Sequence, residues 1–325
     1  MGDSASGWSL RTVRFRFQIG ELAPLSAPFP VAVLDRHFMD LTGDPDALQL
    51  PLAEFGSRVA GFIVYGHPTT RELPMVTMCG PVVRFVNLQY ERCFVTLDGS
   101  YEDYLRKFPS KRRSALRAKI KKLFALPGEK VEMREYREEG EMDEFHRLAC
   151  ELSARTYQER LFGKGLPATP EFGARLRELA RLGQGRGYVL VQGAKAIAFL
   201  YAKIDAAGRI AYDYVGYDPD YRDYSPGTVL HLLILERLFA AKDSRVFDFG
   251  EGDAEHKRFL ANGTARCADL YYFPPNPRAL ALGGSQIALH LLSRGITRTV
   301  EALGVKDKIR RFVRRRVSVR GAQSS

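Results

Sequence analysis

Apolar and polar positions divide this chain into a strand-rich first part and a mixed second part. Between residues 31 and 98, short apolar runs separated by Gly and Pro predict strands at Arg58–Tyr65, Met75–Met78, Val82–Leu88 and Cys93–Leu97. Residues 1–30 are rich in proline and have no clear period, so we expect an irregular lead-in there.

A basic helical pattern follows. From residue 111 to residue 124, apolar side chains recur at helical spacing between lysines and arginines, which predicts a helix. Ser110 is its expected N-cap, and Pro127-Gly128 is expected to end it.

Beyond this helix, helical and strand patterns alternate. The predicted strands are Val131–Tyr136, Gly187–Gln192, Ala196–Ile204, Arg209–Tyr217, Val246–Phe249 and Ala268–Phe273. The predicted helices are Met142–Thr156, Glu171–Leu182, Thr228–Ala241 and Asp253–Asn262. This order is typical of an α/β fold.

Composition excludes several protein classes. The 325 residues are 45% hydrophobic, which fits a globular chain that buries a core. Four cysteines without a CxxC pair argue against a disulfide scaffold or a zinc ribbon, and the histidines show no metal-ligand spacing. We find no secretion signal and no apolar run long enough to span a membrane, and we expect a cytoplasmic protein without a metal.

The net charge of +11 is concentrated in two segments. Residues 101–130 carry a net +7, and residues 286–325 carry a net +8. Such segments attract phosphates, nucleic acid or anionic lipid, and the alternative for each is a solvated helix face. In residues 286–325 the arginines alternate with apolar residues as in a basic amphipathic helix, which suits a peripheral membrane contact at the inner face, a tRNA contact or a lid.

One junction carries the functional argument. A predicted strand runs into the loop DPDYRDYSPG, which opens onto the helix TVLHLLILERLF. A helix N-terminus has free N–H groups and a partial positive charge, so it suits an anion such as a diphosphate. Gly227 lets a ligand approach the backbone, and Arg222 adds a full charge. The alternative is a tight turn before a capped helix.

This junction resembles the motif of GNAT-type N-acyltransferases. More specifically, SPGTVLHLL followed by FDFGEGDAEHKRFL resembles the acetyltransferase domain of the CelD type, which is related to FemAB-like peptidyl transferases. The resemblance covers residues 101–273 and includes the basic segment at its start. It departs from the family pattern at His256, where an aromatic residue is usual, and leaves Lys257 in place.

The resemblance implies a GNAT-like mixed sheet flanked by helices, in a tandem arrangement. We expect an irregular lead-in (1–30), a degenerate N-terminal GNAT-like half (31–100), a GNAT acyltransferase domain (101–275) and a basic C-terminal segment (276–325). The loop residues that would hold the phosphates of acyl-CoA are Arg222, Tyr224, Ser225, Pro226, Gly227 and Thr228. For Ser225 and Thr228 a plain N-cap is the alternative.

The resemblance also suggests catalytic residues. In FemAB-like relatives, the lysine that matches Lys257 lies near the reacting carbonyl, where a cation stabilises developing negative charge. Asp248 would accept or orient the proton of an amine, and His256 is a candidate general acid or base or a packing residue. For the acceptor, we expect contacts from Tyr157, Gln158, Arg160 and Glu251.

Three hypotheses follow. The first is an N-acyltransferase that moves an acyl group from acyl-CoA to an amine on an amino sugar, amino acid, glycan or peptide, through a tetrahedral intermediate. The second is an aminoacyl transferase of the FemAB type that uses aminoacyl-tRNA, because tRNA contacts are largely phosphate contacts. The third is a non-catalytic scaffold that binds a membrane or nucleic acid through its basic segments.

Overall fold

The computed structural model describes residues 7–19, 22–155, 165–251, 255–277 and 284. The chain divides into two compact units: unit 1 comprises Met1–Glu91 and Ala265–Ser325, and unit 2 comprises Arg92–Thr264. The predicted boundaries, after residues 100 and 275, lie later in the sequence than these divisions. No helix within the described residues is long and apolar enough to cross a membrane.

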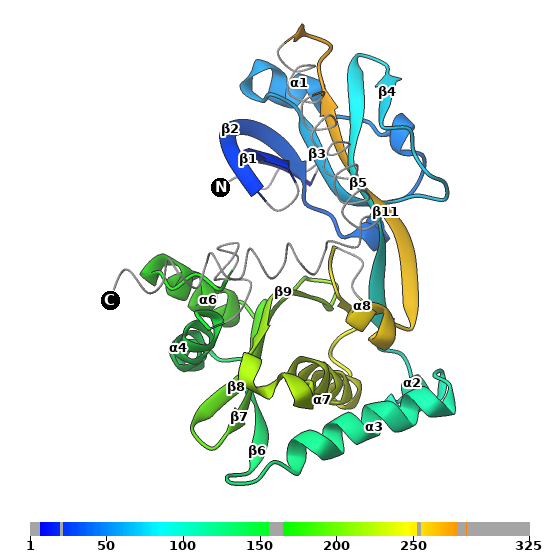
Figure 1. Cartoon of the computed structure of the whole chain (residues 1–325). Coiled ribbons are helices and arrows are strands. Elements are labelled where there is room, and N and C mark those ends of the chain that lie inside the picture. The colour runs from blue at the N-terminus through cyan, green and yellow to red at the C-terminus, as the bar shows by residue number, and fades with distance from the viewer. Residues whose placement is uncertain (1–6, 20–21, 156–164, 252–254, 278–283, 285–325) are drawn as a thin grey trace. The chain divides into compact units, whose positions relative to one another are not determined.

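Unit 2 contains a mixed sheet with helices on both faces (Figure 1). Its strands lie in the order β5-β10-β9-β8-β7-β6, and only the β9–β10 pair is parallel. The strands are β6 (Val131–Tyr136), β7 (Gly185–Gln192), β8 (Lys195–Ile204), β9 (Arg209–Tyr217), β10 (Val246–Asp248) and the last part of β5 (Val82–Thr96). The helices are α2 (Tyr101–Arg106), α3 (Ser110–Phe124), α4 (Met142–Ser153), α6 (Pro170–Arg181), α7 (Pro226–Ala241) and α8 (Glu255–Leu260), with the 3-10 turns η4 (Glu139–Glu141) and η5 (Pro219–Tyr224).

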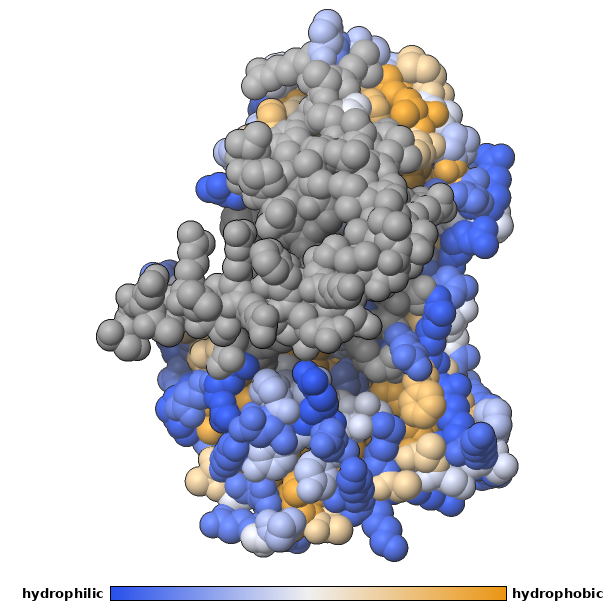
Figure 2. All heavy atoms as spheres, in the orientation of Figure 1, coloured by the Kyte–Doolittle hydropathy of each residue, from blue (hydrophilic) through white to orange (hydrophobic). Residues whose placement is uncertain are grey.

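Strand β7 shows why the central strands are apolar along their length. Tyr188 and Leu190 lie in the core cluster formed with α3 and α7, whereas Val189 and Val191 lie in the cluster formed with α4 and α6. Successive side chains of a strand point to opposite faces, so a strand covered on both faces needs apolar residues at every position. On the visible face of unit 2, most residues are hydrophilic (Figure 2). These observations confirm the expected mixed sheet flanked by helices.

Strands β9 and β10 separate near the middle of β9. Their last parallel pair is Asp248 with Ala211, whereas β9 continues to Tyr217. On its other side, β9 shifts register against β8 between Tyr212 and Tyr214. The second half of β9 therefore has one edge that is not paired with β10, next to the start of α7.

Unit 1 is built on a second group of strands. These are β1 (Trp8–Ile19), β2 (Leu22–Leu34), β3 (Phe62–Pro68), β4 (Val76–Cys79), most of β5, and most of β11 (Gly263–Phe273). Strand order is β1-β2-β3-β11, and β4 pairs with β5. Short helical segments complete the unit: η1 (Phe38–Asp40), η2 (Pro45–Ala47), α1 (Leu52–Phe55) and η3 (Gly56–Arg58). Whether this unit is a degenerate GNAT-like half stays a prediction.

The prediction of an irregular lead-in over residues 1–30 was wrong. Residues 8–19 pair antiparallel with residues 22–34 as β1 and β2. Prolines hid this pattern, because Pro28 and Pro30 lie within β2. Strand β2 pairs with β3 only at Ala32 and Val33, and on this side of Pro30 the carbonyl forms the bond, accepting from the Ala60 N–H at 2.7 Å, so no proline N–H is needed there. A missing N–H costs little at such a position.

Two smaller predictions also need correction. Residues 82–96 form one strand rather than two, because the polar residues between the apolar runs do not turn the chain; the Gln89 side chain instead bonds the backbone of Leu73. Pro109, not Ser110, is the N-cap of α3, and no side chain caps that helix. The helix ends at Phe124, ahead of the predicted Pro-Gly stop.

Candidate active site

The loop between β9 and α7 presents backbone donors at the start of a long helix. Ser225, at the N-cap, has a left-handed backbone conformation with φ 52°. The Val229 N–H donates to the Ser225 carbonyl at 3.1 Å, while Gly227 and Thr228 N–H have no acceptor among the described residues. A Cβ on Gly227 would have only Tyr217 Cδ1 nearby, at 3.6 Å. Open space and unused donors at a helix N-terminus suit an anion.

A buried carboxylate holds this loop in place. Asp218 is fully buried, and its side chain accepts a bond from the Asp220 N–H at 3.1 Å at the start of η5. The same carboxylate pairs with Arg155 and with Lys195, each at 3.0 Å. The loop therefore starts from a fixed point at the end of β9.

Two lysines of α3 reach the same loop. Lys119 Nζ donates to Ser225 Oγ at 2.8 Å, and Lys122 Nζ donates to the Asp223 carbonyl at 2.9 Å. The ammonium of Lys122 also lies 5.1 Å from the centroid of the Tyr224 ring. The sequence showed the basic segment but did not indicate that it packs beside the loop.

A buried ion pair lies where β9 and β10 separate. Asp248, fully buried at the end of β10, accepts bonds from Arg92 Nε at 3.0 and 3.1 Å and from Arg92 Nη2 at 2.6 Å. It also accepts the Gly250 N–H at 2.7 Å. The sequence pattern does not single out Arg92. Its one signal was a charged residue immediately before the apolar run at residues 93–95.

Lys257 of α8 points toward this region. Its side chain is buried, and Nζ donates to the Glu251 carbonyl at 2.5 Å and lies 5.6 Å from the centroid of the Tyr212 ring. Burial lowers the pKa of the Lys257 ammonium, and the carboxylate of Asp248 acts in the opposite direction. Burial also raises the pKa of the Tyr212 hydroxyl, with Asp248 as the second cause.

His231 connects the loop with the lysine region. Its Nδ1 lies 2.7 Å from the Gly227 carbonyl, and its ring meets Tyr212 at 5.6 Å. The Tyr212 ring in turn faces the ammonium of Lys257. The backbone donors of the loop, the rings of His231 and Tyr212, and the ammonium of Lys257 thus follow one another in a chain of contacts beside β9.

Comparison with known proteins identifies this arrangement. A family model described as an acetyltransferase (GNAT) domain matches residues 110–258. Unit 2 carries a GNAT acetyltransferase domain. The match includes the loop, α7, β10 and the part of α8 that contains Lys257, so the resemblance to the CelD type is confirmed at the level of the domain.

Solved structures show the same fold at low sequence identity. The C-terminal domain (DUF2156) assigned to a lysylphosphatidylglycerol synthetase of Agrobacterium fabrum has a TM-score of 0.53 at 13% identity, covering 87% of this chain and 89% of its own. A conserved protein of unknown function from Bacteroides thetaiotaomicron VPI-5482 scores 0.51 at 12% identity, with 75% and 79% covered. The structure of L-PGS from Bacillus licheniformis scores 0.50 at 15% identity, with 86% and 89% covered. No curated protein matches the chain.

Several residues predicted for the GNAT site lie outside what the structure describes. Tyr157, Gln158 and Arg160 fall within residues 156–164, and the side chain of His256 is likewise not described. Glu251 is exposed and contributes its backbone carbonyl to Lys257. The basic segment 286–325 is also outside the described residues.

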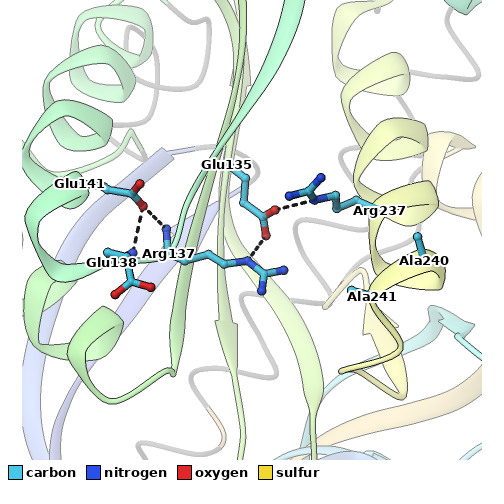
Figure 3. A pocket seen from close by; sticks show the side chains of 7 residues that line it. All are labelled: Glu135, Arg137, Glu138, Glu141, Arg237, Ala240 and Ala241. Atoms are coloured by element: carbon cyan, nitrogen blue, oxygen red, sulfur yellow. Dashed lines mark hydrogen bonds and ion pairs between the residues drawn. The ribbon is translucent and has the colours of Figure 1, made fainter.

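A separate cavity of about 510 Å³ in unit 2 does not belong to the GNAT site (Figure 3). It lies at the C-terminal end of α7, beside Ala240 and Ala241, whereas the loop precedes the N-terminal end of that helix. Glu135 pairs there with Arg137 at 2.5 Å and with Arg237 at 2.9 Å. Glu138 and Glu141 also line the cavity, so three glutamates face two arginines and the lining carries a net charge of −1, which does not favour an anionic substrate.

Proposed function

We propose that unit 2 transfers an acyl group from acyl-CoA to an amine acceptor. One observation carries this proposal: at the α7 N-terminus of a GNAT domain, the Gly227 and Thr228 N–H groups have no acceptor among the described residues, and a Cβ on Gly227 would have only Tyr217 Cδ1 within 4 Å. A diphosphate needs such donors, and the unpaired edge of β9 runs from this point toward Lys257.

The residues of the site suit a thioester donor. Gly227 and Thr228 would bind the diphosphate through their backbone, with Ser225 and the exposed Arg222 beside them. The thioester arm would follow the free edge of β9 toward Tyr212. The donor supplies an activated carbonyl: the amine nitrogen forms a new C–N bond there, the C–S bond breaks, and the amine proton ends on the departing thiol.

Lys257 would stabilise the negative charge that develops on the carbonyl oxygen. A buried cation acts strongly in such a place because little water screens it. Asp248 would act as a positioning residue, since Arg92 and the Gly250 N–H already engage its oxygens. In this proposal its charge keeps Lys257 protonated despite burial. His256 stays a predicted general acid or base, or a packing residue.

The proposal is tested by incubating the full chain with isotope-labelled acyl-CoAs and a panel of amines, read by mass spectrometry. Gly227→Asp should abolish acetyl-CoA binding in isothermal titration, because its carboxylate would face the diphosphate. Gly227→Asn is the matched control of similar size without the charge, and it should retain more affinity. Undetectable acetyl-CoA binding by the unchanged protein would refute the proposal.

A second candidate donor is aminoacyl-tRNA. The lysines and arginines of α3 favour it, because tRNA contacts are largely phosphate contacts. Salt-dependent retention of tRNA on filters, combined with no acyl transfer from CoA donors, would support this candidate over the first. If Lys257→Ala leaves function intact in a folded protein, the chain acts instead as a scaffold.

A further inference from the structure

Lys119 and Lys122 bring two positive charges to the α7 loop without a carboxylate to neutralise them. Within the described part of the chain, neither ammonium lies within 4.0 Å of a carboxylate oxygen. Arg117, on the same helix, differs in this respect, because it pairs with Glu102 at 3.9 Å. The two lysines therefore form a local excess of positive charge at a loop that already presents backbone donors.

Each lysine keeps donors for a ligand. An ammonium has three N–H donors, and each lysine uses one on the loop: Lys119 on Ser225 Oγ, and Lys122 on the Asp223 carbonyl. Residues three apart on a helix lie on one face, with their Cβ atoms about 5–6 Å apart. Lys119 is half-buried and Lys122 is exposed, so a ligand can reach both from solvent.

Resting on the proposed function, we propose that these two lysines bind the phosphates of acyl-CoA. Lys119 contributes to the diphosphate, because its partner Ser225 directly precedes the first turn of α7. Lys122 binds the ribose 3′-phosphate. Lys122 lies about one helical turn after Lys119, beside Tyr224. In CoA, a single ribose separates the 3′-phosphate from the diphosphate, so two neighbouring lysines can each bind one of these groups. The pair would thus select CoA over donors that lack the 3′-phosphate.

Isothermal titration with acetyl-CoA and 3′-dephospho-acetyl-CoA tests this assignment. The unchanged protein should bind acetyl-CoA at least about tenfold more tightly than 3′-dephospho-acetyl-CoA, because one charge-assisted contact has an effect of this size. Lys122→Ala should remove that preference, whereas Lys119→Ala should weaken both ligands by a similar factor. Lys121→Ala is the matched control: it removes the same charge from the adjacent exposed position, which points about 100° away on the helix. Its affinities should not change.

Two results would overturn the inference while leaving the proposed function intact. The first is equal affinity of the unchanged protein for both ligands. The second is that Lys122→Ala lowers the affinity for both ligands by the same factor. Lys122→Gln keeps most of the side chain without its charge and should lose the preference for acetyl-CoA as Lys122→Ala does. If acetyl-CoA does not bind at all, the proposed function fails instead.

Discussion

Arg92→Ala removes the guanidinium that pairs with the buried carboxylate of Asp248. Arg92 is 16% exposed and Asp248 is fully buried, so water cannot replace the lost partner. The negatively charged carboxylate of Asp248 would keep its hydrogen bond from the Gly250 N–H but would lie in a poorly solvated place without the guanidinium. Removing one partner of a buried pair typically costs about 3–5 kcal/mol. That is a large part of the about 5–15 kcal/mol that stabilises a domain.

Hydrogen exchange read by mass spectrometry measures this loss where it occurs. Tryptophan fluorescence would report on the wrong part, because the single tryptophan, Trp8, lies in unit 1. The amide of Phe249 donates to Cys93 at 3.1 Å and the amide of Gly250 donates to Asp248, so both report on the end of β10. Their protection should fall by about two to three orders of magnitude in Arg92→Ala.

Two further variants separate charge burial from lost packing. Adding Asp248→Asn to Arg92→Ala removes the buried charge that has lost its guanidinium partner and should restore much of the protection. Arg134→Ala breaks a pair with Glu132 whose side chains are 41% and 51% exposed, and it should cost less than about 1 kcal/mol. If Arg92→Ala costs no more than Arg134→Ala, or if the double variant is no better than the single one, Asp248 does not depend on Arg92.

Three other outcomes follow from the structure. Because burial lowers the pKa of Lys257, acyl transfer should fall at a pH below that at which an exposed lysine deprotonates, and Lys257→Arg should move this limb to higher pH. Between the lowered pKa of Lys257 in the folded chain and the ordinary lysine pKa in the unfolded chain, the unfolded chain binds more protons. In this interval the contribution of Lys257 to the free energy of unfolding therefore rises with pH. Asp218→Asn removes the charge that anchors the loop and should raise the KM for acyl-CoA several-fold with a smaller change in kcat, as steady-state kinetics would show. Gly187→Ala would place a Cβ 2.4 Å from the buried ring of Phe145 and should destabilise unit 2 by about 1–3 kcal/mol in thermal unfolding, whereas Gly140→Ala, with open space around it, should not.

The sequence predicted unit 2 well where the pattern of apolar residues reflects local geometry. The bounds of β6 and β9 agree with the predicted strands, and the helical spacing of residues 111–124 agrees with α3. These segments are long or strongly periodic, and Gly208 and Pro219 mark the ends of β9, whereas Pro127-Gly128 lies beyond the end of α3. The loop before α7 was found for a similar reason: it joins a clear strand to a clear helix.

Contacts between distant segments were not predictable in this way. Arg92 and Asp248 are far apart in sequence, and only the antiparallel pairing of β5 with β10 makes them neighbours. Lys119 reaches Ser225 because α3 packs beside α7, which no periodicity specifies. The pairing of β1 with β2 was missed because prolines argue against a strand unless no hydrogen bond of the sheet requires their N–H, and that condition depends on the neighbouring strands.

The end of β10 and the placement of Lys257 have a common origin. Asp248 accepts the Gly250 N–H, and Gly250 has a φ of 69°, a conformation that favours glycine, so the chain turns away from β9 directly after the ion pair. That turn leaves the second half of β9 without its parallel neighbour. It also presents the Glu251 carbonyl, which accepts the Lys257 ammonium. In the proposed function, the same carboxylate would thus shape the space for a thioester arm and favour the charged form of the lysine that would act on its carbonyl, which gives a costly buried ion pair a role at this point of the sheet.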